Sequence, residues 1–366
     1  MKIDLIDVKA QYAPLVPELR EAFERVLESG RFIFGTEVEG FEAEAAAYLG
    51  VPHAIGVANG TDAIVLSLEA MGIGVAGNGT ADEVICPAFT FYATAEAIVR
   101  AGATPVFADI DPVSLNLDPE DVERRITPKA KAIMPVHLFG RPAPLAELAS
   151  FGLPLIEDAA QAFGAEGIAT TGVCSTFSFF PTKNLFALGD GGLVACTDDG
   201  TAERLRMLRF HGSRDKRTFE LIGTNSRLDA LQAAFLRVSL PHLAGWNGSR
   251  REGAARYAEL GLGDAVELPA DDAGHVYHMY VVRSPDRDRI AAALAEREIA
   301  SAAYYVTPLH LQPALRYLGW EPGSLPETEK AAAENLALPL WGGIGAEAQE
   351  RVVETVLTAV GAASKA

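Results

Sequence analysis

The feature that most restricts the fold is an alternation of short apolar runs with amphipathic stretches between residues 53 and 160. HAIGVANG, DEVICP and TPVFADI have the length and composition of buried strands. TDAIVLSLEAMG and TAEAIVRAG, which follow the first two, have the apolar spacing of helices that end at a glycine. KAIMPVHLFG, APLAELASFG and LPLIEDAA repeat the order of strand, helix and strand. Strands that are apolar on both faces are typical of sheets covered by helices on both sides, so the pattern predicts an α/β layer fold.

The rest of the chain predicts a second, smaller unit. Two β-rich segments, TTGVCSTFSFFP and GGLVACTD, are followed by a long helical stretch, residues 226–260, that is interrupted near Pro241. VYHMYVVRS then alternates like a strand, and RDRIAAALAEREI and EAQERVVETVLTAVGAA have helical patterns. A chain of 366 residues can form one large domain and one smaller domain. We predict a large domain over residues 1–245 and a small C-terminal domain over residues 246–366.

Charge and hydropathy exclude several classes of protein. The formal net charge of −18 argues against nucleic-acid binding, which needs a basic surface, and fits a cytoplasmic protein. The first residues, MKIDLIDVKAQY, lack the apolar core of a signal peptide, and no apolar run approaches the ~18 residues of a membrane span. Cys86, Cys174 and Cys196 are widely spaced, so we expect free thiols and neither a disulfide framework nor a metal site.

The stretch ANGTDA is the first candidate binding site. It connects a predicted strand directly to a predicted helix, and the free N–H groups and dipole at a helix N-terminus favour an anion. Gly60 would let the backbone approach a phosphate, and Thr61 would add a hydroxyl group. The alternative interpretation is that Thr61 only caps the helix.

A second candidate is the strand end in LIEDAAQAFGA. Asp158 follows a very apolar run, at the position where α/β sheets bind ligands. A carboxylate buried there needs a cationic partner, and Gln161 is close enough in sequence to share the site. The alternative is that Asp158 caps the turn that follows.

Lys183, in FSFFPTKNLFALGDGG, completes the pattern. Most lysines are solvated surface charges, and that interpretation remains open for this one. If Lys183 is buried near Asp158, its lowered pKa makes it a candidate Schiff-base lysine. A phosphate cradle, an acid for a pyridinium nitrogen and a lysine for an aldehyde are together what pyridoxal 5′-phosphate requires, so we predict this cofactor.

On these motifs the chain resembles the DegT/DnrJ/EryC1/StrS family of sugar aminotransferases. The resemblance implies the pyridoxal-phosphate-dependent transferase fold of type I, with a large mixed, mostly parallel sheet domain and a smaller C-terminal α/β domain. The motifs that carry it span nearly the whole chain: GRFIFGTEVEGFEAEAAAYLG, GVANGTDAI, VICPAFTFYATAEAI, PVFADIDP, IEDAAQAFGA, FSFFPTKNL, GDGG, GTNSRLDALQAAFL and PLHLQPA.

The resemblance implies a role for each residue around the cofactor ring. Lys183 would bind the aldehyde and later carry the proton between Cα and C4′. Asp158 would keep the ring nitrogen protonated, and Gln161 would hydrogen-bond the phenolic oxygen. Phe91 would stack on the ring face, although it could also be an ordinary core aromatic. The residues implied to bind the phosphate are Gly60, Thr61 and Ser178.

Three further residues are implied to act at the subunit boundary or near the substrate. Asn225 would reach the phosphate in the neighbouring subunit of a homodimer with shared active sites. Arg227 would meet the substrate, or form only a surface ion pair. His310 would lie near the sugar, with a structural role as the alternative.

The resemblance also implies the reaction. A dehydratase-like branch of the family carries histidine in place of Lys183, so the lysine favours transamination. The substrates implied are an amino-acid donor, L-glutamate, and a nucleotide-linked keto sugar. Asp190-Gly191-Gly192 resembles the members that act on dTDP- or UDP-linked 3-keto hexoses. A 4-keto sugar or keto-cyclitol substrate, a non-catalytic regulator that binds the cofactor, and a structural domain without cofactor remain the alternatives.

Overall fold

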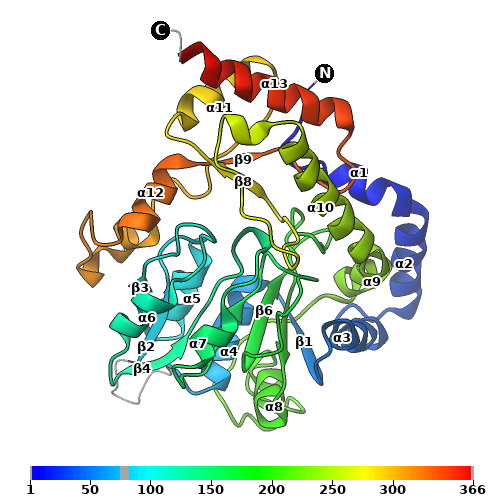
Figure 1. Ribbon diagram of the computed structural model, residues 1–366. Helices are drawn as coiled ribbons and strands as arrows, with labels where there is room; N and C mark the ends of the chain where they lie inside the picture. Colours follow the sequence, from blue (N-terminus) through cyan, green and yellow to red (C-terminus); the bar gives the residue numbers. More distant parts are fainter. Residues whose placement is uncertain (1, 75–81, 364–366) are drawn as a thin grey trace.

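A central sheet organises the larger part of the molecule (Figure 1). The computed structural model of the protein describes residues 2–74 and 82–363. Hydrogen bonds form a four-stranded sheet and a three-stranded sheet within these residues. The first has the order β1 (His53–Val57), β7 (Gly192–Cys196), β6 (Cys174–Ser178), β5 (Ile156–Asp158), and the second the order β3 (Thr104–Ala108), β2 (Glu83–Pro87), β4 (Ala130–Ile133).

Two isolated parallel bridges join these sheets into one layer. They pair Ile133 with Leu155 and Val136 with Asp158, which places β4 beside β5. Only β7 runs antiparallel to its neighbours, β1 and β6. The predicted mixed, mostly parallel sheet is therefore confirmed. Because β1, β2, β4, β5 and β6 run in the same direction, the residues that follow them gather at one edge of the sheet.

Alternate residues of each strand pack on opposite faces, as the doubly apolar runs predicted. Ile55 and Val57 of β1 belong to one hydrophobic core, and Ala54 belongs to another. On the first face lie α4 (Gly60–Ala70), α5 (Ala93–Arg100) and α8 (Asp199–Leu208). On the other lie α2 (Val16–Ser29), α3 (Thr36–Leu49), α6 (Pro119–Arg125), α7 (Leu145–Ala149) and α9 (Ala230–Ser239).

The strands are shorter in the structure than the apolar runs that predicted them. The run at residues 131–140 is a regular strand only as far as Ile133, with one further bridge at Val136, because Pro135 has no N–H group and a 3₁₀ turn follows at Leu138–Gly140. The run at residues 276–284 forms β8 only over Tyr280–Arg283. The predicted α4, α5, α7, β1, β2, β3, β5, β6 and β7 all lie where the sequence pattern placed them.

The long helical stretch is confirmed with its interruption. After α9 a 3₁₀ turn, Leu240–His242, contains Pro241, and α10 (Leu243–Glu259) continues from it. α10 rises from the sheet toward the C-terminal part of the molecule (Figure 1). Its early residue Leu243 packs in a core with the sheet, whereas Ala254 and Tyr257 pack with the C-terminal elements.

The C-terminal part is built on an antiparallel pair of strands, β8 with β9 (Asn335–Leu338). Ile3 from the start of the chain packs into the same core and forms a parallel bridge with Ile299. The first described residues of the chain therefore lie in the C-terminal part of the molecule (Figure 1). The helices of this part are α11 (Arg287–Glu296), α12 (Pro326–Glu334) and α13 (Ala346–Ala363), and α1 (Val8–Tyr12) precedes α2.

We keep the division of the chain near residue 245 as a proposal. It has support from α10, which begins in one core and ends in the other. Residues 309–325 qualify it, because Leu309, Leu315 and Leu325 pack into the core of the sheet. Residues 1, 75–81 and 364–366 of the proposed domains lie outside the described residues.

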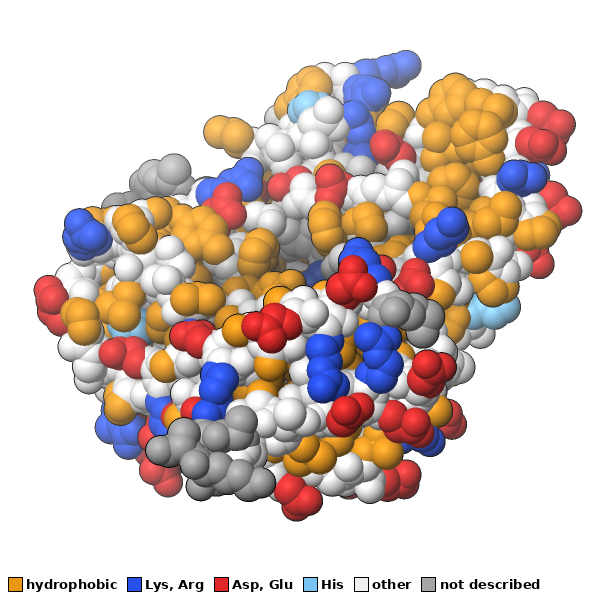
Figure 2. Space-filling view, turned by 90° about the horizontal axis from the view of Figure 1, so that it is seen from above, with side chains coloured by type: hydrophobic (Ala, Val, Ile, Leu, Met, Phe, Trp, Pro, Cys, Tyr) orange, Lys and Arg blue, Asp and Glu red, His pale blue; other side chains and the backbone are white. Residues whose placement is uncertain are grey.

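Charges of both signs are interspersed on the face shown in Figure 2, with hydrophobic side chains between them. Among residues 2–74 and 82–363, no helix combines the length and the hydropathy needed to cross a membrane.

Candidate active site

The end of β1 and the end of β6 meet closely at the carboxyl edge of the sheet. A Cβ atom added to Gly60 would lie 2.8 Å from Cβ of Ser178, so only glycine fits there without displacing a neighbour. The side chain of Asn59 caps α4 by accepting a hydrogen bond of 2.8 Å from the N–H of Asp62. The alternative interpretation, in which Thr61 caps this helix, is therefore wrong. The N–H groups of Gly60 and Thr61 precede the first intrahelical bond and are oriented to receive an anion.

Asp158 lies at the end of β5 and is 5% exposed. Its Oδ2 accepts a hydrogen bond of 2.8 Å from the hydroxyl of Thr94, and its Oδ1 accepts one of 3.2 Å from the N–H of Ala160. The bond from Ala160 is the turn-capping contact that the alternative interpretation expects. It uses only Oδ1, so capping does not account for Oδ2. Burial raises the pKa of Asp158, although the bonds from Thr94 and Ala160 and the charge of Lys183 oppose the rise.

Lys183 has its amine in the interior next to Asp158. Burial lowers the pKa of Lys183 to about 8, against the opposing effect of the Asp158 charge. Its backbone N–H donates a hydrogen bond of 2.8 Å to the carbonyl of Phe180, which closes the turn after β6. The alternative of a solvated surface lysine is wrong, because an amine with this pKa is partly neutral near pH 8 and can act as a nucleophile or base.

The remaining residues predicted for the ring come from two further segments. Gln161 is held by the N–H of Phe139, at 2.7 Å from Oε1, and by the hydroxyl of Tyr305, at 3.1 Å from Nε2. This orients its amide and leaves one N–H of Nε2 available. Phe91 is 57% exposed, with its ring centroid 6.1 Å from that of Tyr305. It is thus no core aromatic, and its ring has a free face.

Asn225 and Arg227 lie on the segment that leads into α9. Asn225 is exposed and bridges to Phe210. The Arg227 guanidinium lies 6.0 Å from the ring centroids of both Phe34 and Phe210, at the outer limit of a cation–π contact. Ser226, between the two, accepts a hydrogen bond of 3.1 Å from the N–H of Ala58, so this segment is anchored beside the Gly60 loop.

The side chain of His310 is buried, although a residue that contacts the substrate should be accessible. Its side chain is 1% exposed, and Nε2 lies 3.2 Å from Oε1 of Glu329. Burial lowers the pKa of His310, while Glu329 opposes that effect. Direct contact with a substrate would require this segment to move, so a role near the sugar stays a prediction.

Comparison with known proteins identifies the family. A family model described as the DegT/DnrJ/EryC1/StrS aminotransferase family matches residues 15–357. The chain belongs to this family. The "Pleiotropic regulatory protein" of Geobacillus stearothermophilus is 47% identical, over 97% of this chain and 98% of its own length. The dTDP-3-amino-3,4,6-trideoxy-alpha-D-glucose transaminase of Streptomyces venezuelae is 44% identical, over 97% and 95% of the two chains.

Solved structures of DegT/DnrJ/EryC1/StrS relatives confirm the fold. The crystal structure of DesV from S. venezuelae superposes with a TM-score of 0.92 at 43% identity, over 97% of both chains. That of ntda from Bacillus subtilis, with bound cofactor PMP, gives a TM-score of 0.89 at 32% identity, over 94% of this chain and 82% of that one. The protein is an aminotransferase of this family, and pyridoxal 5′-phosphate is its cofactor.

The described residues fit this cofactor. The close approach of Gly60 to Ser178 brings the N–H groups at the start of α4 beside the Ser178 hydroxyl, a set of donors that suits a phosphate group. The amine of Lys183 has the lowered pKa that reaction with an aldehyde needs. Each carboxylate oxygen of Asp158 retains a lone pair for a ring N–H. Phe91 presents an open aromatic face.

The family site also contains residues that the sequence analysis missed. Thr94 lies inside an ordinary helical pattern, and Tyr305 is separated from Gln161 by 144 positions, so neither carried a local signal. A buried pair, His137 and Glu157, lies behind Asp158. Because His137 Nδ1 accepts from the N–H of Ala143, its Nε2 carries the hydrogen that meets Oε2 of Glu157 at 3.0 Å.

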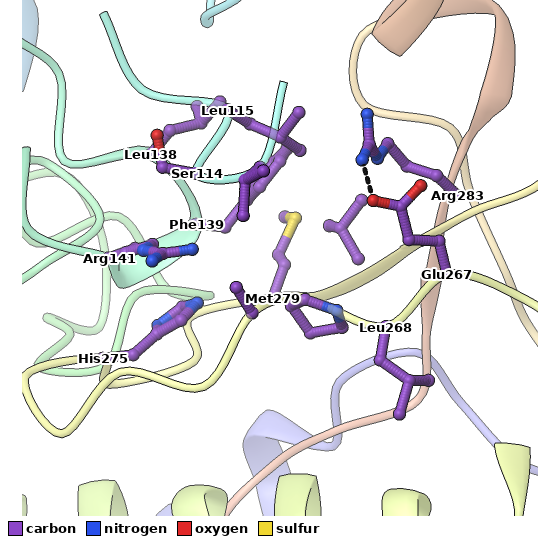
Figure 3. Close-up of a pocket in the computed structure, with 14 residues that line it drawn as sticks. Ser114, Leu115, Leu138, Phe139, Arg141, Glu267, Leu268, His275, Met279 and Arg283 are labelled. Carbon is purple, nitrogen blue, oxygen red and sulfur yellow. Dashed lines mark hydrogen bonds and ion pairs between the residues drawn. The ribbon is translucent and has the colours of Figure 1, made fainter. Parts of the chain in front are cut away.

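A separate small pocket of about 20 Å³ lies between residues 113–141 and 267–283 (Figure 3). None of the residues predicted to bind the cofactor lines it. Its charged groups are already paired, Arg283 with Glu267 and Arg141 with Asp272 at 3.3 Å. It therefore offers no free charged group for an anionic substrate.

Proposed function

We propose that this aminotransferase moves an amino group from L-glutamate to the 3-keto group of a dTDP- or UDP-linked deoxyhexose. The observation that carries the proposal is the pairing of a half-buried Lys183, whose pKa is lowered to about 8, and a buried Asp158 beside the Gly60–Ser178 cradle. These groups meet the needs of amino-group transfer. A base must remove the proton from Cα of the donor, and a carboxylate must keep the ring nitrogen of the cofactor protonated.

Each residue then has a defined task. Bound pyridoxal phosphate supplies an electron-withdrawing ring that weakens the Cα–H bond of an attached amino acid. Lys183 would take up that proton and deliver it to C4′ of the cofactor. Asp158, fixed by Thr94, holds a proton on the ring nitrogen. Phe91 covers one ring face, and Gln161 donates to the phenolic oxygen. The phosphate is bound by Gly60, Thr61 and Ser178.

The substrate class has support from the relative in S. venezuelae, whose name describes a dTDP-sugar aminated at C3. Asp190-Gly191-Gly192 points the same way by resemblance. The structure gives Gly192 a packing reason as well, since an added Cβ would lie 2.4 Å from the backbone of Asn59. A 4-keto nucleotide sugar and a keto-cyclitol are the alternative substrates.

The second candidate function is a regulator that binds the cofactor without turnover. The relative in G. stearothermophilus, 47% identical, bears the name "Pleiotropic regulatory protein". Such a protein would keep the Lys183 site and its spectrum but release no aminated product.

The proposed assembly is a cytoplasmic homodimer with shared active sites. The exposed Asn225 would reach the cofactor phosphate of the neighbouring subunit, and Arg227 would meet the substrate near the same boundary. His310 would act near the sugar. The net charge of −18 supports an assembly that binds neither nucleic acid nor anionic membranes.

The first test is a visible absorbance spectrum with and without glutamate, beside Lys183→Ala. A cofactor band that bleaches with glutamate, and is absent from the variant, supports transamination through Lys183. A panel of 3-keto and 4-keto nucleotide sugars then identifies the acceptor by product mass. A band that responds to no amino donor supports the regulator, and failure to bind added cofactor contradicts both functions.

A further inference from the structure

The residue after the catalytic lysine belongs to a buried pair of amides. Asn184 is 1% exposed, and its Nδ2 donates a hydrogen bond of 2.7 Å to Oδ1 of Asn247 on α10. The same Nδ2 donates one of 2.9 Å to the carbonyl of Val276, in the segment that leads to β8. Both donor hydrogens of Asn184 are thus used, and both partners are more than 60 positions away in sequence.

Asn247 extends the connection to the loop that follows Asp158. It is 2% exposed, and its Nδ2 donates a hydrogen bond of 3.2 Å to the carbonyl of Phe163. Gly164 makes room for it, because a Cβ atom there would lie 2.8 Å from that nitrogen. The two amides therefore link the segment that carries Lys183 to the segment that carries Asp158 and Gln161.

The same face of α10 also holds the C-terminal part. Arg250 lies one helical turn after Asn247 and is fully buried. Its Nη1 donates hydrogen bonds of 3.1 to 3.3 Å to the carbonyls of Tyr277, His278 and Leu340. One stripe of α10 thus fixes both the segment with Lys183 and the connection to β8.

We propose that Asn184 and Asn247 are positioning residues, which hold the amine of Lys183 at its buried place beside Asp158. The proposal rests on the proposed function in taking Lys183 as the catalytic amine. The two side-chain amides make a rigid connection, because each is hydrogen-bonded to two separate segments. Asn184 donates both hydrogens of Nδ2, whereas Asn247 accepts through Oδ1 and donates through Nδ2. Removing either side chain frees the turn at Lys183 from α10.

A purely structural role would have a different consequence. Loss of two buried asparagines would then lower stability and leave the environment of the Lys183 amine unchanged. Two titratable groups interact with this amine: the charge of Asp158 on β5 raises the pKa of Lys183, and the charge of Lys183 lowers the pKa of His278, in the segment before β8. The ionisation of Lys183 itself is therefore the readout that separates the two roles.

The experiment measures the reaction of Lys183 with acetic anhydride as a function of pH, in the full chain without cofactor, by peptide mass spectrometry. Asn184→Ala and Asn247→Ala are compared with the wild type and with Asn116→Ala. Asn116 is a matched control, a buried asparagine whose Nδ2 donates to the carbonyls of Arg141 and Pro142. Both test variants should raise the labelling midpoint by about one pH unit toward the value of a solvated lysine.

The double variant adds a second criterion. If the two amides act as one connection, Asn184→Ala/Asn247→Ala should shift the midpoint no further than either single variant. Should Asn184→Ala fail to fold, Asn247→Ala tests the same connection without a change beside Lys183. An unchanged midpoint in the folded variants, or an equal shift in Asn116→Ala, overturns the proposal. Because no cofactor or turnover is involved, failure of the transaminase assay would leave this result interpretable.

Discussion

Thr94 and Asp158 are joined by a hydrogen bond of 2.8 Å between the threonine hydroxyl and one carboxylate oxygen, and both side chains are buried. Thr94 lies in the first turn of α5, whereas Asp158 ends β5, so the bond connects two neighbouring parts of the sheet edge. It lowers the pKa of a carboxyl group that burial raises. Thr94 therefore helps to keep Asp158 ionised in a site that would otherwise favour the neutral acid.

Thr94→Val should slow the reaction with glutamate. A hydrogen bond to a charged group contributes about 1.5–3 kcal/mol, which corresponds to roughly tenfold or more in rate. Stopped-flow measurement of the visible band with glutamate checks this. Ser67→Ala is the control, since Ser67 is a buried hydroxyl in α4 that donates to the carbonyl of Ala63 at 2.8 Å and lies away from Asp158 in the hydrogen-bond pattern. Equal rates in the two variants would contradict a role for Thr94 at Asp158.

Gly60→Ala should weaken cofactor binding. The added methyl group would lie 2.8 Å from Cβ of Ser178, so the phosphate cradle must open. We expect the dissociation constant for pyridoxal phosphate to rise about tenfold, the effect of ~1.4 kcal/mol, in a fluorescence titration. Gly245→Ala, in α10, is the control, because an added Cβ there meets no atom within 4 Å. A normal affinity in Gly60→Ala would show that the phosphate binds elsewhere.

Asp158→Asn should lower the pKa of Lys183 below its value of about 8. The charge of Asp158 raises the pKa of Lys183, while burial lowers it, so removal of the charge leaves burial unopposed. In the cofactor-free protein, the pH midpoint of Lys183 labelling should move to lower pH. Glu147→Gln, an exposed glutamate on α7, should leave the midpoint in place. An unchanged midpoint in Asp158→Asn would mean that the two groups do not interact.

The ionisation of Lys183 should also make the free energy of unfolding depend on pH in a predictable direction. Its folded pKa lies below the ordinary value of 10.5, so between pH 8 and 10.5 the unfolded chain binds more protons. The contribution of Lys183 to the free energy of unfolding therefore rises with pH in that window. Lys183→Met should remove this rise, as urea unfolding of cofactor-free protein at pH 8 and pH 10 can show. An unchanged pH dependence would contradict the buried position of the amine.

Glu157→Gln should destabilise the protein at neutral pH. The buried Glu157 accepts hydrogen bonds from His137 and from the N–H groups of Ala169 and Gly172, which hold its pKa below the ordinary value despite burial. We expect a loss of about 1–3 kcal/mol, since an amide cannot accept from all three donors. The stabilisation is present above the unfolded pKa of 4.5 and is lost as pH falls through the folded pKa. The difference from wild type should therefore shrink on acidification, and a constant difference would contradict this assignment.

The sequence predicted the parts of the fold that repeat a local pattern. Apart from α6, which was not predicted, the strands and helices between His53 and Asp158 follow from hydropathy alone, because each is apolar with the period of its element. α2, α3 and α12 lie outside that alternation and were not predicted. The extent of β4 and β8 was also misjudged, because hydropathy shows that a segment is buried but not whether it has a strand partner.

The site was predictable where a residue stands at the end of an element. Gly60, Asp158 and Ser178 follow or end strands, and the direction of parallel strands brings such residues to one edge. Thr94 and Tyr305 act through bonds that only the folded chain creates. His310 was recognisable in a family motif, but the motif does not reveal which way the ring points. In the structure the ring faces Glu329.

The placement of Ile3 in the C-terminal core bears on the order in which the chain can fold during synthesis. Its N–H bonds the carbonyl of Glu298 at 3.0 Å, and its carbonyl accepts from Ala300 at 2.8 Å. Those partners leave the ribosome some 300 residues later. The segment around Ile3 must thus remain unpaired until Ala300 has been translated, and the C-terminal core closes only when these two distant segments meet.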